Sequence, residues 1–300
     1  MVVATNACRG ERLRQGSAGQ ATAAPYGARK PQWRDRAVIA VTSGLPASWL
    51  TLRIAILLRR LVLNRLTDDL GFDVQRWGMR MRLHPRRNGC EKGALFTPQL
   101  YDAAERQELA AEIAHAPEDR PFVFVDVGAN VGLLSLFVAS RARANARILA
   151  FEPESENVRR LRFNIAANPG IPVEVFPLAL GETAGTLILD LNRLDKGGTR
   201  ARHDDDSELG ADCIRVECRP LFDVLAQQDV KRIDALKIDV EGAEAAILLP
   251  FFRDAPESLW PRLLIIEDTR GMWPVDLFSK LDTFGYRTAT RSKLNVMMRR

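Results

Sequence analysis

The chain has 300 residues, of which 46% are hydrophobic, and it carries a formal net charge of +5. This length and hydrophobic content suffice for one large α/β domain with an extension. The four cysteines, Cys8, Cys90, Cys213 and Cys218, form no C-x-x-C pair, and the three histidines do not cluster. The pattern argues against a structural zinc site, predicts no bound metal, and favours a reduced, cytoplasmic protein.

The positive charge is concentrated in the first third of the chain. Residues 1–90 hold 16 Lys and Arg against 5 Asp and Glu, whereas the remainder holds 27 against 33. Residues 1–36 are rich in Arg, Ala, Gly and Gln and show little apolar periodicity, so we predict a disordered basic tail. A cleaved targeting peptide is the alternative, although the segment lacks the apolar core of a secretory signal.

Residues 37–90 are predicted to form an apolar and basic helical extension that ends in a first strand. Gly44 and Pro46 break its apolar part, and arginines interrupt it, so the segment does not fit a membrane span. Residues 48–66 favour one helix that packs on the main domain or on a partner subunit. The alternative is peripheral contact with an anionic membrane surface, which would be the inner membrane of a cytoplasmic protein. No aromatic-interleaved basic patch supports nucleic-acid binding.

Two elements are expected between this extension and the main sheet. Residues 74–85 alternate loosely between apolar and polar side chains, which indicates a strand or hairpin. Residues 101–114 place Ala104, Leu109 and Ile113 at helical spacing. The second element therefore leads into the main domain as a helix.

Residues 121–135 predict the first unit of a nucleotide-binding α/β sheet. Residues 122–127 are a short apolar run that indicates a buried parallel strand, and residues 131–140 indicate a helix with one apolar face. Gly128 would permit the tight turn between them, and Gly132 would allow the helix to pack closely on the strand. Free N–H groups at the start of this helix would face a ligand.

The glycine spacing differs from that of a dinucleotide-binding loop, which reads G-x-G-x-x-G. Here Asp126 precedes the first glycine, and Asn130 lies between the two. An acid at this position would repel a pyrophosphate but attract an ammonium or sulfonium group, and S-adenosylmethionine carries both. An ordinary strand-to-helix turn is the alternative explanation.

A second acid follows one βαβ unit later. Residues 147–151 indicate a strand that ends in Glu152 and Pro153, 26 residues after Asp126. A carboxylate at the end of the second strand can accept two hydrogen bonds from a ribose diol. A helix-start acid that the helix dipole favours is the simpler alternative.

The rest of the chain continues to alternate between strands and helices. We expect strands at 173–178, 185–191, 213–220, 233–240, 262–266 and 294–298, and helices at 154–167, 244–252 and 274–284. The turn 179–182 lies at the carboxyl end of the third strand, where an open α/β sheet lines its ligand crevice.

A polar insertion, 192–212, separates two of the expected strands and is predicted to be a hairpin-like excursion with a mobile tip. It contains His203 followed by three aspartates. Adjacent side chains of this kind are ordinarily solvated rather than metal-bound. Contact with substrate is the more plausible role for such a loop.

The strand at 233–240 carries three charges on one side, which are costly in a central strand unless they are paired or functional. Lys237 is expected deeper in the sheet, paired with a carboxylate. Asp239 and Glu241 fall at the carboxyl end, and they are the candidate catalytic residues for accepting a proton from an acceptor hydroxyl. Asp239 could instead bind the cofactor ammonium, and His203 is a weaker candidate base.

Three segments together resemble the FkbM family of S-adenosylmethionine-dependent methyltransferases. They are 125–132 (VDVGANVG), 151–153 (FEP) and 236–244 (LKIDVEGAE), and the resemblance runs from about Trp77 to the C-terminus. It implies a Rossmann-like, seven-stranded methyltransferase sheet, mostly parallel with its last strand antiparallel, in a domain spanning 91–300. The family's aromatic-Glu pair near the cofactor corresponds here to Tyr101 and Asp102, whose shorter acid departs from the pattern.

The resemblance implies O-methylation of a small-molecule or carbohydrate-like hydroxyl compound with S-adenosyl-L-methionine as cofactor. The turn at 179–182 would then border the adenine ring. The expected cofactor-binding residues are Asp126, Gly128, Ala129, Asn130, Gly132, Glu152, Pro153, Leu180 and Gly181. An N-methyl acceptor is the alternative, which the absence of an Asn-Pro-Pro-Tyr signature on the fourth strand disfavours.

Two other classes of function compete with this prediction. A non-catalytic methyltransferase-like module could be tethered to membrane or to a partner by the basic extension. A nicotinamide oxidoreductase is disfavoured because the glycine spacing is wrong. Cofactor binding distinguishes the three, since only the oxidoreductase should hold a dinucleotide.

Overall fold

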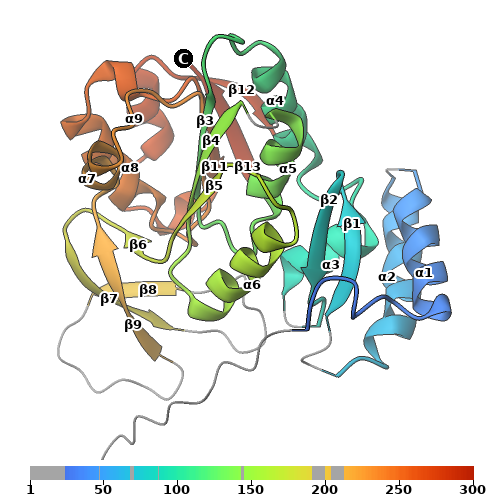
Figure 1. The fold of residues 1–300 in the computed structure, drawn as a ribbon. Coiled ribbons are helices and arrows are strands. Elements are labelled where there is room, and N and C mark those ends of the chain that lie inside the picture. Colours follow the sequence, from blue (N-terminus) through green and yellow to red (C-terminus); the bar gives the residue numbers. More distant parts are fainter. Residues whose placement is uncertain are drawn as a thin grey trace, which may run out of the picture.

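The computed structural model describes residues 24–46, 48–67, 71–86, 88–142, 145–190, 200–203 and 213–300 (Figure 1). At its centre is a seven-stranded sheet in the order β12-β13-β11-β10-β3-β4-β5. The strands are β3 (Phe122–Val127), β4 (Ala146–Phe151), β5 (Val173–Phe176), β10 (Ala235–Ile238), β11 (Leu263–Glu267), β12 (Arg287–Arg291) and β13 (Asn295–Arg299). The strands from β11 to β5 pair in parallel, and β13 is antiparallel to both of its neighbours. The predicted fold class is confirmed.

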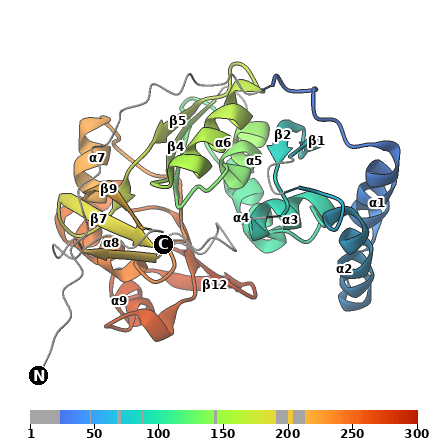
Figure 2. The ribbon, with the colours of Figure 1, turned by 90° about the horizontal axis from the view of Figure 1, so that it is seen from below.

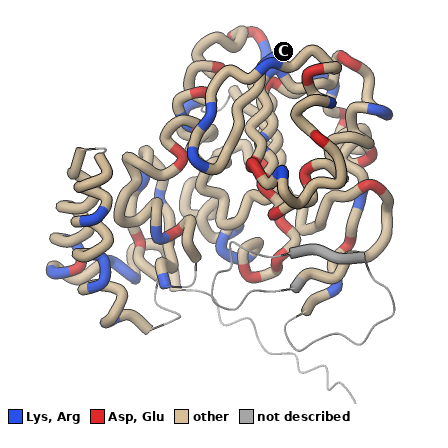
Figure 3. Tube along the Cα trace, turned by 180° about the vertical axis from the view of Figure 1, so that it is seen from behind, with Lys and Arg blue, Asp and Glu red and all other residues tan. Residues whose placement is uncertain are grey.

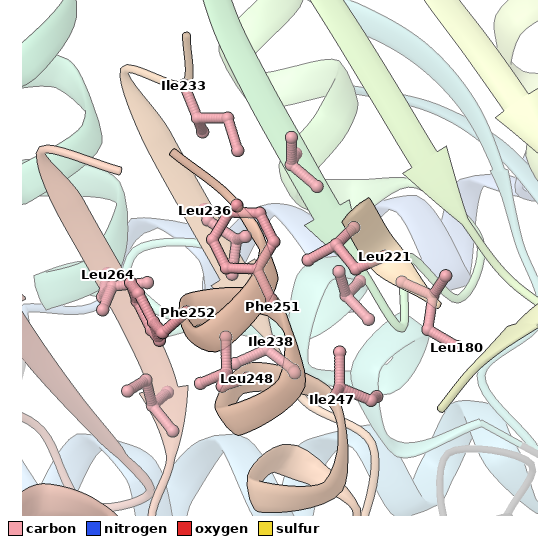
Figure 4. Packing of buried hydrophobic residues seen from close by; sticks show 14 of the residues in the cluster. Leu180, Leu221, Ile233, Leu236, Ile238, Ile247, Leu248, Phe251, Phe252 and Leu264 are labelled. Carbon is pink, nitrogen blue, oxygen red and sulfur yellow. The ribbon is translucent and has the colours of Figure 1, made fainter. Parts of the chain in front are cut away.

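Helices cover both faces of this sheet, which is why its central strands β3, β4, β10 and β11 are almost continuously apolar. The helices α4 (Ala103–Ala114), α5 (Leu133–Ala142) and α6 (Ser155–Ala166) lie on one side, and α7 (Leu221–Gln227), α8 (Glu244–Asp254) and α9 (Leu277–Thr283) on the other. Alternate residues of β3 serve the two faces: Val123 and Val125 belong to the core under α7 and α8, and Phe122 and Phe124 to the core under α5. Figure 4 shows the first core, where side chains of α8 lie against those of β10 and β11.

A smaller sheet forms after the third strand. Its order is β6-β9-β7-β8, and its strands are β6 (Ala179–Leu180), β7 (Gly185–Asp190), β8 (Arg200–His203) and β9 (Cys213–Arg219). The predicted strands at 185–191 and 213–220 are therefore present. The expected turn at 179–182 is wrong in its first half, because Ala179 and Leu180 pair in parallel with β9. The structure describes only 200–203 of the polar insertion, so the aspartates after His203 lie outside the described residues.

The sequence prediction missed one strand of the main sheet. β12 consists of Arg287–Arg291, and its side chains are mostly exposed. An edge strand that buries almost nothing carries no apolar alternation, so the pattern had nothing to detect.

The N-terminal part holds two helices, a β-hairpin and a third helix: α1 (Trp33–Gly44), α2 (Trp49–Leu63), β1 (Phe72–Arg76), β2 (Met79–Leu83) and α3 (Gly89–Phe96). The predicted helix at 48–66 and hairpin at 74–85 are present, with a turn in which Trp77 and Gly78 both have positive φ. The hairpin and α3 share one apolar cluster with β3 and α5, so this core crosses the domain boundary predicted at residue 90. In Figure 2 the α1–α2 pair lies at the edge of the molecule, away from the sheet.

The disordered tail was predicted to run to residue 36, which is wrong for residues 24–36. The main-chain N–H groups of Gly27 and Arg29 donate to the carboxylate of Asp73, at 2.8 and 2.9 Å. Asp73 also forms a buried ion pair with Arg82, whose guanidinium donates to the main-chain oxygens of Ala24 and Pro25. One buried aspartate thus binds the segment to the β1–β2 hairpin, and composition could not reveal this contact.

Candidate functional site

A cavity of about 620 Å³ lies at the carboxyl ends of β3, β4, β10 and β11, next to the smaller sheet. Most of the predicted site residues line it, namely Gly128, Ala129, Asn130, Glu152, Pro153, Leu180, Gly181, Asp239 and Glu241. Asp126 and Gly132 are not among its lining residues. The structure therefore brings nine of eleven predicted residues to one cavity, as expected for the crevice of an open α/β sheet.

The glycine turn after β3 lies at the base of the cavity, between the ends of two strands. Gly128 has φ of +74°, and a Cβ there would collide with the main-chain oxygen of Asp239. Gly132 has φ of +83°, and a Cβ there would meet Leu161 of α6. The close packing predicted for Gly132 is real, but its partner is a helix rather than the strand. Of these two glycines, Gly128 lines the cavity and lets the loop approach the end of β10.

Asp126 does not face the cavity, in contrast to the direct cofactor contact expected for it. Its side chain is buried; Oδ2 accepts a hydrogen bond from Ser135 at 2.6 Å, and Oδ1 lies 4.0 Å from Lys237 Nζ. Successive side chains of a strand point to opposite faces of the sheet, so the side chain of Asp126, which lies within β3, points into the packed layer beneath the loop and not into the cavity. Asp126 thus lies beside Lys237, which lines the cavity.

Glu152 reaches the cavity from the end of β4 while 94% of it is buried. Its two oxygens accept hydrogen bonds from the main-chain N–H groups of Asn130 and Glu154, at 2.8 and 3.0 Å. Burial raises the pKa of Glu152 to about 7, although these hydrogen bonds oppose the rise. The carboxylate is therefore held rigidly against the glycine loop, with a protonation state that changes near neutral pH.

Three carboxylates meet at the ends of β10 and β11. Asp239, Glu241 and Glu267 each place one oxygen within 4.8 Å of the others. Burial, followed by the neighbouring Asp239 and Glu241, raises the pKa of Glu267 and so favours its protonated form. Oxygen atoms at this spacing could hold a divalent cation or share a proton, and the raised pKa of Glu267 favours proton sharing.

Lys237 links this cluster to the loop. Its Nζ lies 3.2 Å from Asp239 Oδ2 and donates to the main-chain oxygen of Gly128 at 3.1 Å. Although burial disfavours the charged form, Asp239, Asp126 and Asp102 raise the pKa of Lys237. The predicted pairing of Lys237 with a carboxylate is confirmed, and it keeps a cation beside the acidic wall.

The loop after β10 is held in a left-handed conformation, with φ of +56° at Glu241 and +106° at Gly242. Glu244 fixes it: Oε1 accepts from the N–H groups of Val240 and Gly242, and Oε2 accepts from Thr269 and Trp273. A non-glycine residue at positive φ is strained, and strain of this kind is common at functional sites. Glu241 is thus presented to the cavity by a buried anchor.

Several residues that line the cavity escaped the sequence prediction. Cys90 and Gly89 come from α3, Leu294 precedes β13, and Glu267 ends β11. Tyr101 and Asp102, expected near the cofactor only through the family resemblance, also line it. For Glu267 a signal existed, because an acid at the end of a parallel strand next to β10 must face the same edge. For Cys90 there was none, because α3 itself was not predicted.

Comparison with known proteins identifies the family. The model of the methyltransferase FkbM domain matches residues 126–287. A methyltransferase of Sordaria araneosa, sdnD, is 34% identical over 181 residues, which cover 51% of this chain and 65% of that protein. The AMB antimetabolite synthetase AmbE of Pseudomonas aeruginosa is also 34% identical over 181 residues, covering 49% of this chain but 8% of its own length.

The chain thus spans less than two thirds of the length of either relative. Among solved structures, the methyltransferase FkbM of Methylobacillus flagellatus KT superposes with a TM-score of 0.41 at 15% identity, covering 81% of this chain and 59% of its own. The assignment rests on the family model, which covers more than half of the sequence and contains the glycine loop, Glu152 and the acidic cluster. The chain belongs to the FkbM family of methyltransferases.

Proposed function

We propose that this methyltransferase uses S-adenosyl-L-methionine and transfers its methyl group to a hydroxyl oxygen of a small-molecule or carbohydrate-like acceptor. The observation that carries the proposal is the arrangement of one cavity, with Glu152 on one side of the Gly128 loop and the Asp239 cluster on the other. The relatives named methyltransferases support the reaction class, and the acceptor class belongs to the proposal.

The residues present fit this cofactor. Gly128 lets the loop lie against the end of β10 at the edge of the cavity, and the buried Glu152 carboxylate can accept hydrogen bonds from a ribose diol. Leu180 and Gly181 offer an apolar edge for the adenine ring, and Asn130 lines the same cavity from the glycine loop. The acidic wall at Asp239 suits the ammonium and sulfonium charges of the methionine part.

When bound, the cofactor supplies an already activated methyl group, so the protein must align the acceptor and exclude water. A hydroxyl acceptor loses a proton as its oxygen attacks. Asp239 and Glu241 are the proposed acceptors of this proton because both line the cavity at the end of β10. Glu267 lies beside Asp239 in the same cluster, and Lys237 holds Asp239 in place through the ion pair.

The decisive experiment is calorimetric titration of the purified chain with S-adenosylhomocysteine, with NADH in parallel. We expect micromolar binding of S-adenosylhomocysteine and none of NADH. Binding of NADH would indicate an oxidoreductase, and binding of neither compound would favour a non-catalytic module. A screen of hydroxyl and amine acceptors, read as methyl transfer, then separates O- from N-methylation.

A further inference from the structure

The surface formed by α1 and α2 carries large apolar side chains that are exposed instead of packed in a core. Among the described residues, eleven large hydrophobic side chains are exposed, and eight of them lie on these two helices. These eight, which we term the α1–α2 face, are Trp33, Val41, Trp49, Leu50, Leu52, Ile54, Leu57 and Leu61. Single exposed hydrophobic residues are ordinary, but a cluster on one element marks an interaction surface.

The arrangement on α2 is regular. Leu50, Ile54, Leu57 and Leu61 follow one another at steps of four, three and four residues, which places them in a stripe along one side of the helix. Their exposed fractions are 53%, 39%, 61% and 56%, whereas Ala55 and Val62, on the opposite side, are fully buried. The helix thus packs Ala55 and Val62 against the protein and turns these four large apolar side chains outward.

The charges beside the stripe are almost all positive. Between Trp33 and Leu66 the sequence holds six arginines and a single acid, Asp35, which pairs with Arg65 at 2.7 Å. Arg53 and Arg60 are exposed and lie one heptad apart, three residues after Leu50 and Leu57, so they border the stripe. Figure 3 shows this excess, with blue segments on the helix pair at the edge of the view.

Two exposed tryptophans complete the pattern. Trp33 and Trp49, at the first turns of the two helices, are each about two-thirds exposed, and the guanidinium groups of Arg34 and Arg53 lie over their rings at 5.2 and 5.6 Å. Tryptophan combines an apolar ring with one N–H donor and is enriched where lipid meets water. Arginine and tryptophan flanking an apolar stripe are typical of helices that lie in a membrane interface.

We propose that the α1–α2 face docks on an anionic lipid surface, with α2 lying in the plane of the interface. In the part of the chain that the structure describes, no helix is long and apolar enough to cross a bilayer. A second copy of this chain is the less suitable occupant, because symmetric pairing along the stripe would bring arginines of one copy against those of the other. Anionic headgroups instead complement them, and each arginine near such a surface contributes favourably.

Docking by this face would also hold the candidate site near the lipid. An open pocket at the start of α2 is lined by Trp49, Leu52, Leu100 and Tyr101, and Tyr101 lines the main cavity as well. The lipid proposal does not depend on the methyl-transfer reaction, so either can fail without the other.

The test is sedimentation of the full chain with vesicles of phosphatidylcholine alone or mixed with phosphatidylglycerol. We expect binding to the mixed vesicles only, and its loss at about 1 M salt, where screening reduces the Debye length to about 3 Å. The double changes Leu57→Gln with Leu61→Gln, and Arg53→Gln with Arg60→Gln, should each weaken partitioning about tenfold or more.

Matched controls alter the same chemistry elsewhere. Met272→Gln with Val275→Gln removes two other exposed apolar side chains, and Arg253→Gln with Arg287→Gln removes two other exposed charges. Both controls should bind vesicles like the unaltered chain. Absence of binding to the mixed vesicles, or equal loss in the controls, overturns the proposal. So does a dimer that the leucine changes disperse without any vesicle binding, since the face would then belong to a second copy.

Discussion

Gly128 shows how one residue lets the glycine loop after β3 lie against the end of β10. Its φ is +74°, and the space a side chain would need is taken by the main chain of Asp239. Gly128→Ala should therefore lower the free energy of unfolding by more than the roughly 1 kcal/mol expected for backbone strain alone. Urea unfolding measures this directly.

Gly170 provides the control, because its φ is +84° and no atom lies within 4 Å of the place that a Cβ would occupy. Gly170→Ala carries the same strain without the collision. If the two alanine variants lose equal stability, the close approach of the loop to β10 is not what requires glycine at position 128.

Glu152 makes the proposed ribose contact testable through its pKa. The ionised carboxylate accepts hydrogen bonds from a diol, so binding should lower the pKa of about 7 that burial gives this group. Affinity for S-adenosylhomocysteine should then fall as the pH drops below about 7, since a bound proton must first leave. Glu152→Gln should weaken binding by about 1–3 kcal/mol and flatten this dependence between about pH 6 and pH 8.

Calorimetry at several pH values gives both quantities for the variant and for Glu118→Gln, an exposed control. An unchanged pH profile in Glu152→Gln would remove the ribose assignment, because other groups would then have to account for the titration.

Single residues were predictable where a motif fixed both their type and their place at a strand end. Glu152 and Asp239 met that condition, and both line the cavity. Asp126 was expected to contact the cofactor, whereas its buried side chain does not line the cavity and lies beside Lys237. Glu267 was missed although it ends a predicted strand, because that signal points to the cavity only once β11 is placed beside β10 in the sheet order.

At the scale of elements, apolar runs in the sequence predicted the buried strands but did not predict the exposed strands. β12 pairs only with β13 in the main sheet, so its sequence was free to be polar. The loop after β10, in contrast, is part of a sequence motif. Glu244 of the third motif binds this loop to the segment after β11 through four hydrogen bonds. The third motif thus supplies the residue that fixes the conformation of this loop as well as the carboxylates that line the cavity.

Glu244→Gln should break this anchor. The amide can accept at one oxygen only, so two of the four donors face an NH₂ group, and the cost should be about 1.5–3 kcal/mol of unfolding free energy. Because the loop carries Glu241 at positive φ, acceptor methylation should fall more than S-adenosylhomocysteine affinity. Glu257→Gln, which alters an exposed ion pair with Arg300, is the control for charge loss. Equal effects on activity in both variants would contradict the anchoring role.

At the scale of the whole molecule, the three motifs predicted the sheet, and composition misplaced the start of the ordered chain. Low apolar periodicity correctly describes residues 24–32, which contain no helix or strand. They are ordered by contacts to a distant buried ion pair, Asp73 and Arg82, and no local pattern encodes a partner more than forty residues away.

Two truncations separate that contact from everything before it. A chain lacking residues 1–23 keeps the donors at Gly27 and Arg29, whereas a chain lacking 1–36 leaves the buried Asp73 carboxylate without them and removes the first turn of α1. Each lost partner of a buried charged group costs about 1–3 kcal/mol, and each kcal/mol lowers the Tm of a domain this large by about 2–4 °C. Thermal unfolding should therefore place the shorter chain several degrees below the longer one. Equal Tm values would mean that residues 24–36 add nothing to the fold, and the tail predicted from composition would stand.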